Sequence, residues 1–329
     1  MKNLIGNKRV SWPARIAEQL LISSCILIAV ALTTNCGAAS VNPSAATSSP
    51  AANASSSPSG QGATPSGQGA AAQTPSTQIL PTPAVSNTNA QGPSTQLPAP
   101  ASNAKVFSNL EEAPAPWWSC TAPCAGGQVS NNYSTNIVSS PVLDGQSREF
   151  FNGGGPYSNV LWVKNDMGAQ NYAQHFLWDY SFYLDDRTSE SVYAMEADLW
   201  LSQDHYEYML GTQVHYPDGD GKPGHLDTWS QTTLQWIHNY DKPVARFAPN
   251  QWHRAQWYME RSAADHSYTY KTLVIDGGTD HEQVFQFNQT YQAGPCDWAD
   301  AFGIQWQLDL NQYGIDAREN VDKVSVTLW

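Results

Sequence analysis

Short segments in which apolar and polar residues alternate occupy the chain after Lys105, and Gly, Pro, Asn and Asp residues separate them. This period of two is typical of β-strands that bury one face, because successive side chains of a strand point to opposite sides. The clearest segments are residues 175–184, 191–201, 206–215, 228–238, 252–262, 268–275, 283–287, 302–310 and 321–329. No helical pattern of about 10–15 residues separates them, so we predict an all-β antiparallel sandwich or barrel. The only helical turn expected lies near residues 296–301.

The stretch that precedes these segments has a different composition. From residue 38 to about residue 103 it consists mainly of Ala, Ser, Pro, Thr, Gln, Gly and Asn, and the next charged residue is Lys105. The fragment Pro-Ser-Gly-Gln-Gly-Ala occurs at Pro58 and again at Pro65. Such a sequence cannot bury enough apolar surface to offset its conformational entropy. We therefore predict a disordered linker over residues 37–105 and one folded domain over residues 106–329.

Residues 1–36 have the pattern of a signal peptide or lipoprotein leader. The apolar run from Leu20 to Leu32 is shorter than the roughly 20 residues of a transmembrane helix. Basic residues precede it, at Lys2, Lys8, Arg9 and Arg15. Cys36 would be the lipidated residue of a lipoprotein; ordinary cleavage near residues 37–39 and an uncleaved anchor are the alternatives. We predict a secreted or cell-surface protein that contacts a membrane only through this leader or a lipid anchor.

The charge and the aromatic content narrow the range of partners. The formal net charge is −13 and the pI about 4.8, so a polyanion such as DNA would be repelled and nucleic acid is not an expected partner. A neutral glycan is favoured over an anionic one for the same reason. The chain has 13 Trp and 15 Tyr residues, an unusually high content of large aromatic side chains. Most should fill the core, but exposed ones suit stacking on a pyranose ring.

Three cysteines follow the leader, and they favour a structural role. Cys120 and Cys124 lie four residues apart, and Cys296 is distant. An exported protein can form disulfides, so either one of the first two pairs with Cys296, or Cys120 pairs with Cys124. No second close pair of Cys or His completes the spacing of a zinc site, so no metal is expected here.

Candidate binding residues come from strands whose polar side chains share a face. In the segment 191–201, Glu196, Asp198 and Trp200 point away from the apolar positions, among which Tyr193 is counted as core. Other segments repeat this division, with Gln213 and His215, with Gln305, Gln307 and Asp309, and with Arg254, Gln256, Tyr258 and Glu260. Acids, amides and aromatic rings together suit a concave groove that binds sugar hydroxyls. The alternative is an ordinary solvated face of an antiparallel sheet.

The chain also resembles a known superfamily. Glu-Ala-Asp-Leu-Trp at 196–200, Asn-Gln-Trp-His at 250–253 and Val-Asp-Lys-Val-Ser-Val at 321–326 are similar to segments of the concanavalin A-like lectin and glucanase jelly rolls. The resemblance covers most of residues 130–329 and implies a jelly-roll sandwich. Because the superfamily contains lectins, glycosidases and lyases, it does not imply one activity.

One comparison within that superfamily is with family-16 glycoside hydrolases. Their catalytic strand, Glu-x-Asp-x-(x)-Glu, would make Glu196 the nucleophile and Asp198 its assistant. The acid/base position, however, is occupied by Trp200 or Leu201. A retaining mechanism needs a second carboxyl group about 5–5.5 Å from the first. It would have to come from another strand, and the candidates are Glu207, Glu260 and Asp309.

A second comparison is with alginate-lyase-type polysaccharide lyases. Gln213-Val214-His215 is similar to their Gln-Ile-His motif, in which Gln neutralises a uronate and His abstracts the C5 proton. Tyr208 or Tyr313 would then supply the acid. No counterpart of their Arg-x-Glu-Leu-Arg strand occurs, and basic residues are scarce.

The resemblance implies at most one kind of metal site, a structural calcium site. Jelly rolls of this kind often bind one structural Ca²⁺. Asp218 and Asp220 alternate along a loop as calcium ligands do, but the other ligands of such a loop are missing, and a plain turn explains the sequence better.

The sequence thus predicts an exported sandwich that binds a polysaccharide or cell-wall glycan through Glu196, Asp198, Trp200, Gln213, His215, Gln305, Gln307 and Asp309. A hydrolase or lyase with a non-standard catalytic set is one alternative. A non-catalytic structural or adhesive surface module is the other.

Overall fold

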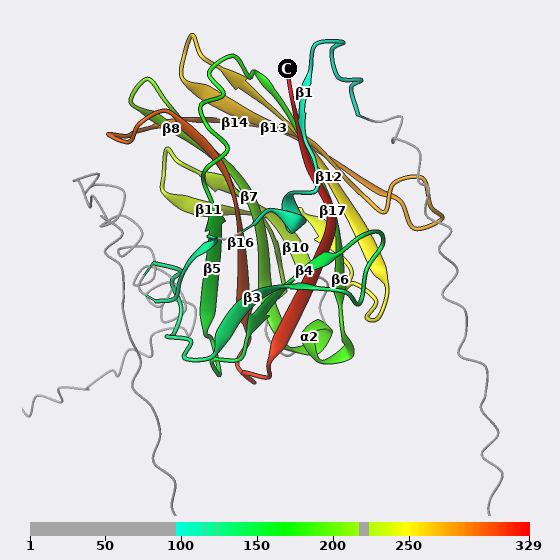
Figure 1. The fold of residues 1–329 in the computed structure, drawn as a ribbon. Helices are drawn as coiled ribbons and strands as arrows, with labels where there is room; N and C mark the ends of the chain where they lie inside the picture. The colour runs from blue at the N-terminus through cyan, green and yellow to red at the C-terminus, as the bar shows by residue number, and fades with distance from the viewer. Residues whose placement is uncertain (1–96, 115, 123, 217–223) are drawn as a thin grey trace, which may run out of the picture. The chain divides into compact units, whose positions relative to one another are not determined.

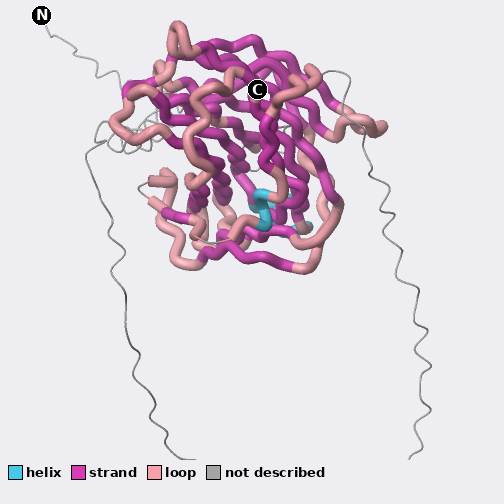
Figure 2. The backbone as a smooth tube through the Cα atoms, turned by 45° about the horizontal axis from the view of Figure 1, so that its top comes forward, coloured by secondary structure: helices cyan, strands magenta, loops and turns pink. Residues whose placement is uncertain are grey.

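The alternating segments form the strands of two antiparallel sheets packed face to face (Figure 1). The structure, a computed structural model, describes residues 97–114, 116–122, 124–216 and 224–329. Strands and loops make up almost all of this part (Figure 2), which confirms the all-β antiparallel sandwich. The leader, Cys36, the predicted linker up to residue 96, Asp218 and Asp220 lie outside the described residues, so the predictions made for them stay predictions.

The first sheet has eight strands and the second has nine. In spatial order the first contains β14 (Gln283–Gln292), β13 (Ser267–Ile275), β12 (Trp252–Ser262), β6 (His175–Leu184), β17 (Ala317–Leu328), β4 (Ser147–Asn152) and β3 (Tyr133–Val138), with β1 (Lys105–Phe107) on β17. The second contains β11 (Gln235–Val244), β10 (Gly224–Ser230), β9 (Thr212–His215), β7 (Val192–Gln203), β16 (Ala301–Leu310), β5 (Asn159–Lys164) and β2 (Trp118–Cys120), with β8 (Tyr206–Leu210) on β7 and β15 (Gly294–Pro295) on β8.

Two of the predicted strands are each divided in the structure. The segment 206–215 forms β8 and β9, which are separated at Gly211. A Cβ atom at Gly211 would lie 2.9 Å from the Cβ of Trp229, so only glycine allows β10 to approach there. The segment 228–238 contains the turn between β10 and β11, where Leu234 adopts a φ of 53°. In both places the strand is interrupted, although apolar and polar residues alternate correctly on either side.

Helical structure lies elsewhere than predicted. Among the described residues it consists of the 3₁₀ turn η1 (Leu110–Glu112) and the short helix α2 (Asp186–Ser191). Asp185 caps α2, because its Oδ1 accepts a 2.7 Å hydrogen bond from the Thr188 amide. Residues 296–300 are irregular, so the helical turn predicted there is wrong. No helix of the described part is long and apolar enough to cross a membrane.

Large aromatic side chains from both sheets fill the space between them. Trp306 of β16 stacks on Phe150 of β4 with ring centroids 5.4 Å apart and lies 5.1 Å from Trp178 of β6. Trp162 of β5 packs on Phe150 at 5.1 Å. All four are buried, so much of the high aromatic content serves the core.

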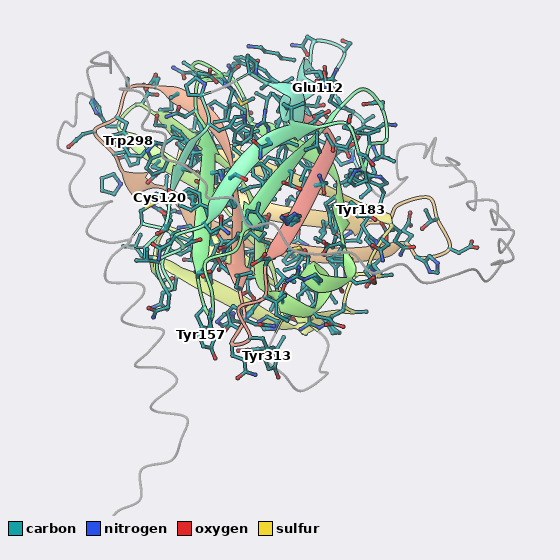
Figure 3. All side chains as sticks on the ribbon, turned by 60° about the horizontal axis from the view of Figure 1, so that its bottom comes forward. Glu112, Cys120, Tyr157, Tyr183, Trp298 and Tyr313 are labelled. Carbon is teal, nitrogen blue, oxygen red and sulfur yellow. A yellow bond between two sulfur atoms is a disulfide. The ribbon has the colours of Figure 1, made fainter. Side chains whose placement is uncertain are left out.

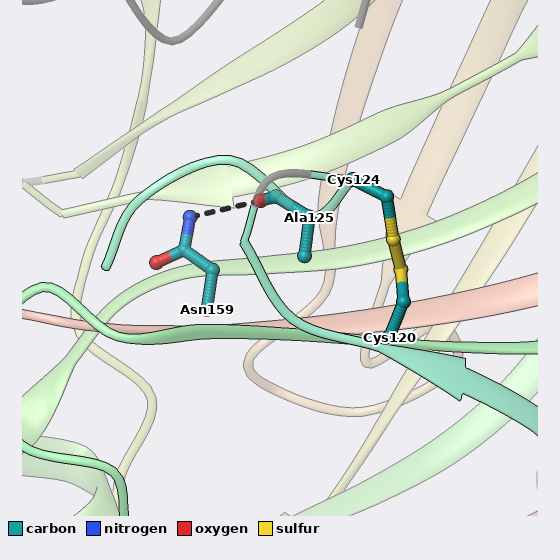
Figure 4. Close-up of a disulfide and its surroundings, with 4 residues drawn as sticks. All are labelled: Cys120, Cys124, Ala125 and Asn159. Carbon is teal, nitrogen blue, oxygen red and sulfur yellow. Dashed lines mark hydrogen bonds between the residues drawn. A yellow bond between two sulfur atoms is a disulfide. The ribbon is translucent and has the colours of Figure 1, made fainter. Parts of the chain in front are cut away.

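The cysteines adopt the second of the predicted arrangements. Cys120 at the end of β2 forms a disulfide with Cys124, and their Cα atoms are 6.3 Å apart (Figure 4). Next to it, the Ala125 carbonyl accepts a 3.2 Å hydrogen bond from Asn159 Nδ2. Cys296 is a buried thiol whose Sγ accepts a hydrogen bond from the Trp298 amide. The disulfide therefore ties β2 to the loop that follows it.

Candidate functional site

The site begins with the alternation along β7. Met195, Ala197, Leu199 and Leu201 belong to the apolar core between the sheets. Glu196, Asp198 and Trp200 point to the opposite face, as predicted, because neighbouring residues of a strand alternate sides. We call the side of the second sheet that carries these three residues the polar face. It spans β2, β5, β16, β7, β9, β10 and β11.

Strand register aligns five polar side chains in one row across the polar face. The Cα partners run from Gln307 to Glu196, then to Gln213, Asp227 and His238, one residue from each of β16, β7, β9, β10 and β11. Side chains directly opposite one another on adjacent strands lie about 4.5–5.5 Å apart at Cβ, so each can contact the next. Gln213 and Gln307 were predicted for this site, whereas Asp227 and His238 were not.

Neutral amides hold the acids of the polar face. Gln307 Nε2 donates a 2.8 Å hydrogen bond to Glu196 Oε1, and Gln305 Nε2 donates a 2.6 Å bond to Asp198 Oδ2. Asp198 Oδ1 also accepts from the Thr212 amide at 2.7 Å. Within the described residues neither acid has an ion-pair partner. These carboxyl groups are therefore oriented without being neutralised by a cation.

Burial and mutual repulsion raise the pKa values of these acids. The pKa of Glu196 is well above its ordinary value because the group is buried and because the charges of Asp309, Asp198 and Asp227 act on it. Burial also raises the pKa of Asp309 strongly. The pKa of Asp198 rises to about 7, since burial outweighs the hydrogen bonds from Gln305 and Thr212. A protonated carboxyl can donate a hydrogen bond as well as accept one, so this face offers both kinds of group.

Exposed aromatic rings border the polar face on several sides. Trp118 of β2 is 55% exposed and lies in register with Val163 of β5, which pairs with Gln305. Tyr240 of β11, at the other edge, is 72% exposed. Trp298 is 48% exposed and meets Trp200 edge-on at 5.5 Å.

Trp200 and Tyr193 differ from their predicted roles. Trp200 is buried, as are the other predicted residues of the polar face except the half-buried His215, and its ring presents little surface for the sugar stacking assigned to it. Tyr193 was counted as core, but the pairing of β7 with β16 shifts between Val192 and Ala194. Its ring packs edge-on against His215, with centroids 4.4 Å apart. This bulge therefore brings Tyr193 to the polar face.

Four side chains at one end of the polar face converge on a point. His215 of β9, His225 and Asp227 of β10, and His238 of β11 each offer one ligand atom, and these atoms lie within 4.8 Å of one another. His238 Nδ1 is 2.9 Å from Asp227 Oδ2, and His225 Nε2 is 3.2 Å from His215 Nδ1. Only His215 was a predicted site residue. The signal in the sequence is His225-x-Asp227, followed on the next strand by His238.

The electrostatics of this cluster are dominated by burial and by Asp227. Burial lowers the pKa of His225 to about 4, against the attraction of Asp227. Burial acts to raise the pKa of Asp227, but hydrogen bonds from His215 and His238 bring it below its ordinary value. The hydrogen bond to Asp227 raises the pKa of His238.

The three candidates for a second catalytic carboxyl group lie at different distances from Glu196 in the fold. Glu260 lies on β12 of the first sheet, where it pairs with Lys271 at 3.2 Å. Glu207 lies opposite Ser202, six residues along β7 from Glu196, which corresponds to about 20 Å. Asp309 is opposite Ala194 and diagonal to Glu196. Of the three, Asp309 lies nearest to Glu196 in strand register.

Other predicted partners do not join the site. The polar residues of β12 lie on the first sheet, where Arg254 pairs with Asp179 at 2.6 Å. Tyr208 is in the core with its hydroxyl 3.3 Å from His266 Nδ1. Tyr313 follows the end of β16, whereas Trp298 precedes its start, and Figure 3 shows them at opposite ends of the molecule. Tyr208 is therefore not placed for the acid role predicted in a lyase, and Gln213 donates at 2.6 Å to Asp227 rather than facing open space.

The resemblance implied a structural calcium ion, and one group of oxygen ligands fits a hard cation. Glu111, Asp144 and Asp322 bring carboxylate oxygens within 4.8 Å of one another. Backbone amides already bond two of them, as Val324 N donates to Glu111 at 2.9 Å and Leu143 N donates to Asp322. Calcium binding remains a prediction, and this cluster is where the chemistry would allow it.

Comparison with known proteins yields distant structural matches. No family model matches the chain, and no curated protein matches it. Similar solved structures include peanut lectin (10% identity, 65% of this chain and 97% of that one, TM-score 0.36). The PL-14 alginate lyase from Aplysia kurodai is another (8%, 60% and 87%, TM-score 0.40). A third is a family 11 carbohydrate-binding module from Clostridium thermocellum in complex with a mixed-linked tetrasaccharide (12%, 68% and 94%, TM-score 0.32). These proteins are concanavalin A-like jelly rolls, and at such identities and TM-scores they carry no inference about function.

Proposed function

We propose that the polar face binds a polysaccharide, and that the domain is a lectin-like module of an exported protein. The observation that carries this proposal is the row of Gln307, Glu196, Gln213, Asp227 and His238 between exposed aromatic rings. Amides and carboxyl groups held in fixed positions suit sugar hydroxyls, which both donate and accept hydrogen bonds.

The aromatic border supports the same ligand class. Trp118 and Tyr240 lie on the two edge strands of the second sheet, β2 and β11, and Trp298 lies beside Trp200. An exposed indole or phenol ring offers a flat apolar surface that matches the apolar face of a pyranose. Rings at separate edges would contact different sugar units, so an extended chain is favoured over a monosaccharide.

Charge favours a neutral glycan. The net charge of the chain is −13, and the polar face carries Glu196, Asp198, Asp227 and Asp309 without a Lys or Arg in the aligned row. A uronate-rich polysaccharide would be repelled by the net negative charge and by Asp227, whose pKa is lowered. This also makes lyase action on alginate the less favoured alternative.

One observation favours glycoside hydrolysis as a second candidate. The charge of Asp309 contributes to the raised pKa of Glu196, and the two residues are diagonal neighbours on adjacent strands. Glycosidases use two carboxyl groups that flank the scissile bond, one protonated and the other ionised. In that case one would protonate the leaving oxygen while the other, ionised, attacks or activates water.

The leader and linker predicted from the sequence suit the same role. A lipidated Cys36, or a cleaved signal peptide, would place the domain outside the cell. A flexible linker would let it reach a wall or environmental glycan. Detection of the domain in membrane or culture fractions, compared between the wild type and Cys36→Ala, tests this part.

The binding proposal is tested by titrating the full chain with neutral β-glucans and with alginate, followed by calorimetry and Trp fluorescence. We expect a neutral glycan to bind and Glu196→Gln to weaken it about tenfold or more. Glu190→Gln, on the exposed surface of α2, is the matched control and should bind normally. If no neutral glycan binds, or if Glu196→Gln binds like the wild type, the proposal fails. Reducing ends that appear with the wild type and disappear with Asp309→Asn would instead establish hydrolysis.

A further inference from the structure

We propose that His215, His225, Asp227 and His238 form a binding site for a divalent transition-metal ion of the Zn²⁺ type. The four residues come from β9, β10 and β11, three adjacent strands at one edge of the second sheet. The site shares Asp227 and His238 with the row that carries the proposed glycan binding, but its test uses metal ions alone, so the two proposals can fail separately.

The distances between the ligand atoms match a tetrahedral site. Zn²⁺ binds imidazole nitrogen and carboxylate oxygen at about 2.0–2.2 Å, so two ligand atoms of a regular tetrahedron are about 3.3–3.6 Å apart. His215 Nδ1 is 3.2 Å from His225 Nε2, which is 3.4 Å from His238 Nδ1. Oxygens of Asp227 lie 3.6 Å from His215 Nδ1, 3.3 Å from His225 Nε2 and 2.9 Å from His238 Nδ1. With Asp227 Oδ2 as the carboxylate ligand, four edges of the tetrahedron measure 3.2, 3.4, 3.6 and 2.9 Å, and three of these are within about 0.1 Å of the ideal range.

Hydrogen bonds within the cluster do not account for all of these contacts. Asp227 Oδ2 accepts from Gln213 and His238, but Asp227 Oδ1 has no hydrogen-bond partner among the described residues, although His225 Nε2 is only 3.3 Å away. A close approach of His215 Nδ1 and His225 Nε2 needs at least one lone pair that points inward. A cation at the centre would accept each inward lone pair and would give Asp227 Oδ1 an opposite charge.

Neighbouring side chains hold the four proposed ligands in place, as outer-shell residues do in known metal sites. Gln213 Nε2 donates to Asp227 at 2.6 Å and fixes the carboxylate. The ring of Tyr193 packs edge-on against His215, and the ring of Tyr240 lies 4.6 Å from that of His225. Because all four ligands lie on strands, their separation is set by strand register rather than by a loop.

The chemical types of the four ligands indicate which metal ions the site would bind. Three imidazoles and one carboxylate suit Zn²⁺, Cu²⁺, Ni²⁺ or Co²⁺, whereas Ca²⁺ and Mg²⁺ prefer oxygen ligands only. Four protein ligands complete a tetrahedral shell, which is typical of a structural site rather than a hydrolytic one. The ion would link β9, β10 and β11, and it would set a positive charge beside the carboxyl groups of the polar face.

The test uses the full chain without a polyhistidine tag, after dialysis against a chelator. We expect one equivalent of Zn²⁺ to bind by calorimetry and to raise the thermal midpoint, and Co²⁺ to give the visible absorption of a tetrahedral complex. Ca²⁺ and Mg²⁺ should do neither. Asp227→Asn and His225→Ala should lower the affinity for Zn²⁺ about 100-fold or more.

Two further variants separate loss of the site from loss of the fold. His238 has a partly exposed side chain, so His238→Gln should fold even where His225→Ala does not, and it should still lose Zn²⁺ affinity and the tetrahedral Co²⁺ spectrum. His281→Ala, in the exposed loop before β14, is the matched control and should bind as the wild type does. A wild type that binds no Zn²⁺, or a His238→Gln variant that binds it as tightly, would overturn the proposal.

Discussion

Gln307 on β16 donates a 2.8 Å hydrogen bond to Glu196 on β7, and the two residues are direct register partners in the second sheet. The bond joins a buried amide to a buried acid, so each group depends on the other for its polar partner. It lies in the middle of the polar face, where the proposed ligand would bind.

Removal of the amide should therefore affect both stability and binding. Gln307→Ala leaves Glu196 without its donor, and we expect a loss of about 1–3 kcal/mol in the free energy of unfolding. Glycan affinity should fall as well, because the carboxyl group loses its orientation. Urea unfolding and calorimetry measure the two effects. Gln292→Ala, on the exposed surface of β14, serves as the control and should change neither quantity.

Stability should decrease as the pH rises from about 4.5 to 8, between the unfolded and the folded pKa values of several buried acids. The pKa values of Asp198 and Glu111 are raised to about 7 and that of Glu319 to about 8, mainly by burial. The pKa of His238 is also raised. A group whose pKa is higher in the folded state binds more protons there, so folding loses stability as it deprotonates. Thermal midpoints measured across this range should decline, and Asp198→Asn should reduce the slope. A slope unchanged in that variant would contradict the assignment.

Glu319 should be replaceable with a gain in stability at high pH. It is buried on β17 beside a cavity of about 20 Å³ between the sheets, and its Oε2 has no hydrogen-bond partner among the described residues. Glu319→Gln keeps the shape and removes the charge. We expect a gain of about 1–3 kcal/mol at pH 9, where the wild type is ionised, and little change near pH 4, where the side chain is largely protonated in both the folded and the unfolded chain. Equal effects at both pH values would argue against a buried charge as the cause.

Trp118 provides a test of the aromatic border. It is exposed on β2 in the same row as Gln305 and Asp198, so Trp118→Ala should weaken glycan binding about tenfold through lost stacking. The fold should be unaffected, because the side chain is exposed. Tyr133→Ala, on β3 of the first sheet, is the control. Binding that is reduced equally in both variants would point to a general effect on the surface.

The disulfide should contribute modestly to stability. Cys120 and Cys124 close a very short loop, for which loop entropy predicts about 2 kcal/mol. Urea unfolding with and without reductant should show a difference of this size, and Cys120→Ser should match the reduced wild type. Because Cys296 lies outside the disulfide, Cys296→Ser should keep the sensitivity to reductant.

Part of the site could be predicted from the alternation of side chains along single strands. Glu196, Asp198 and Trp200 could be assigned to one face because alternation along a strand depends only on the covalent geometry of the chain. The same rule related Gln213 to His215 and Gln305 to Gln307. It failed at Tyr193, where a bulge in β7 changes the alternation, and at Gly211 and Leu234, where the backbone turns.

The sequence by itself therefore determined the β-class, most of the strands and the side to which most of their residues point. It could not determine which strands are neighbours, since pairing depends on contacts between distant segments. Only the tertiary structure placed β12 and Glu260 in the other sheet and brought His225, Asp227 and His238 beside His215. The physical reason is that hydrogen-bonded register between strands is a long-range property, whereas the direction of a side chain along one strand is local.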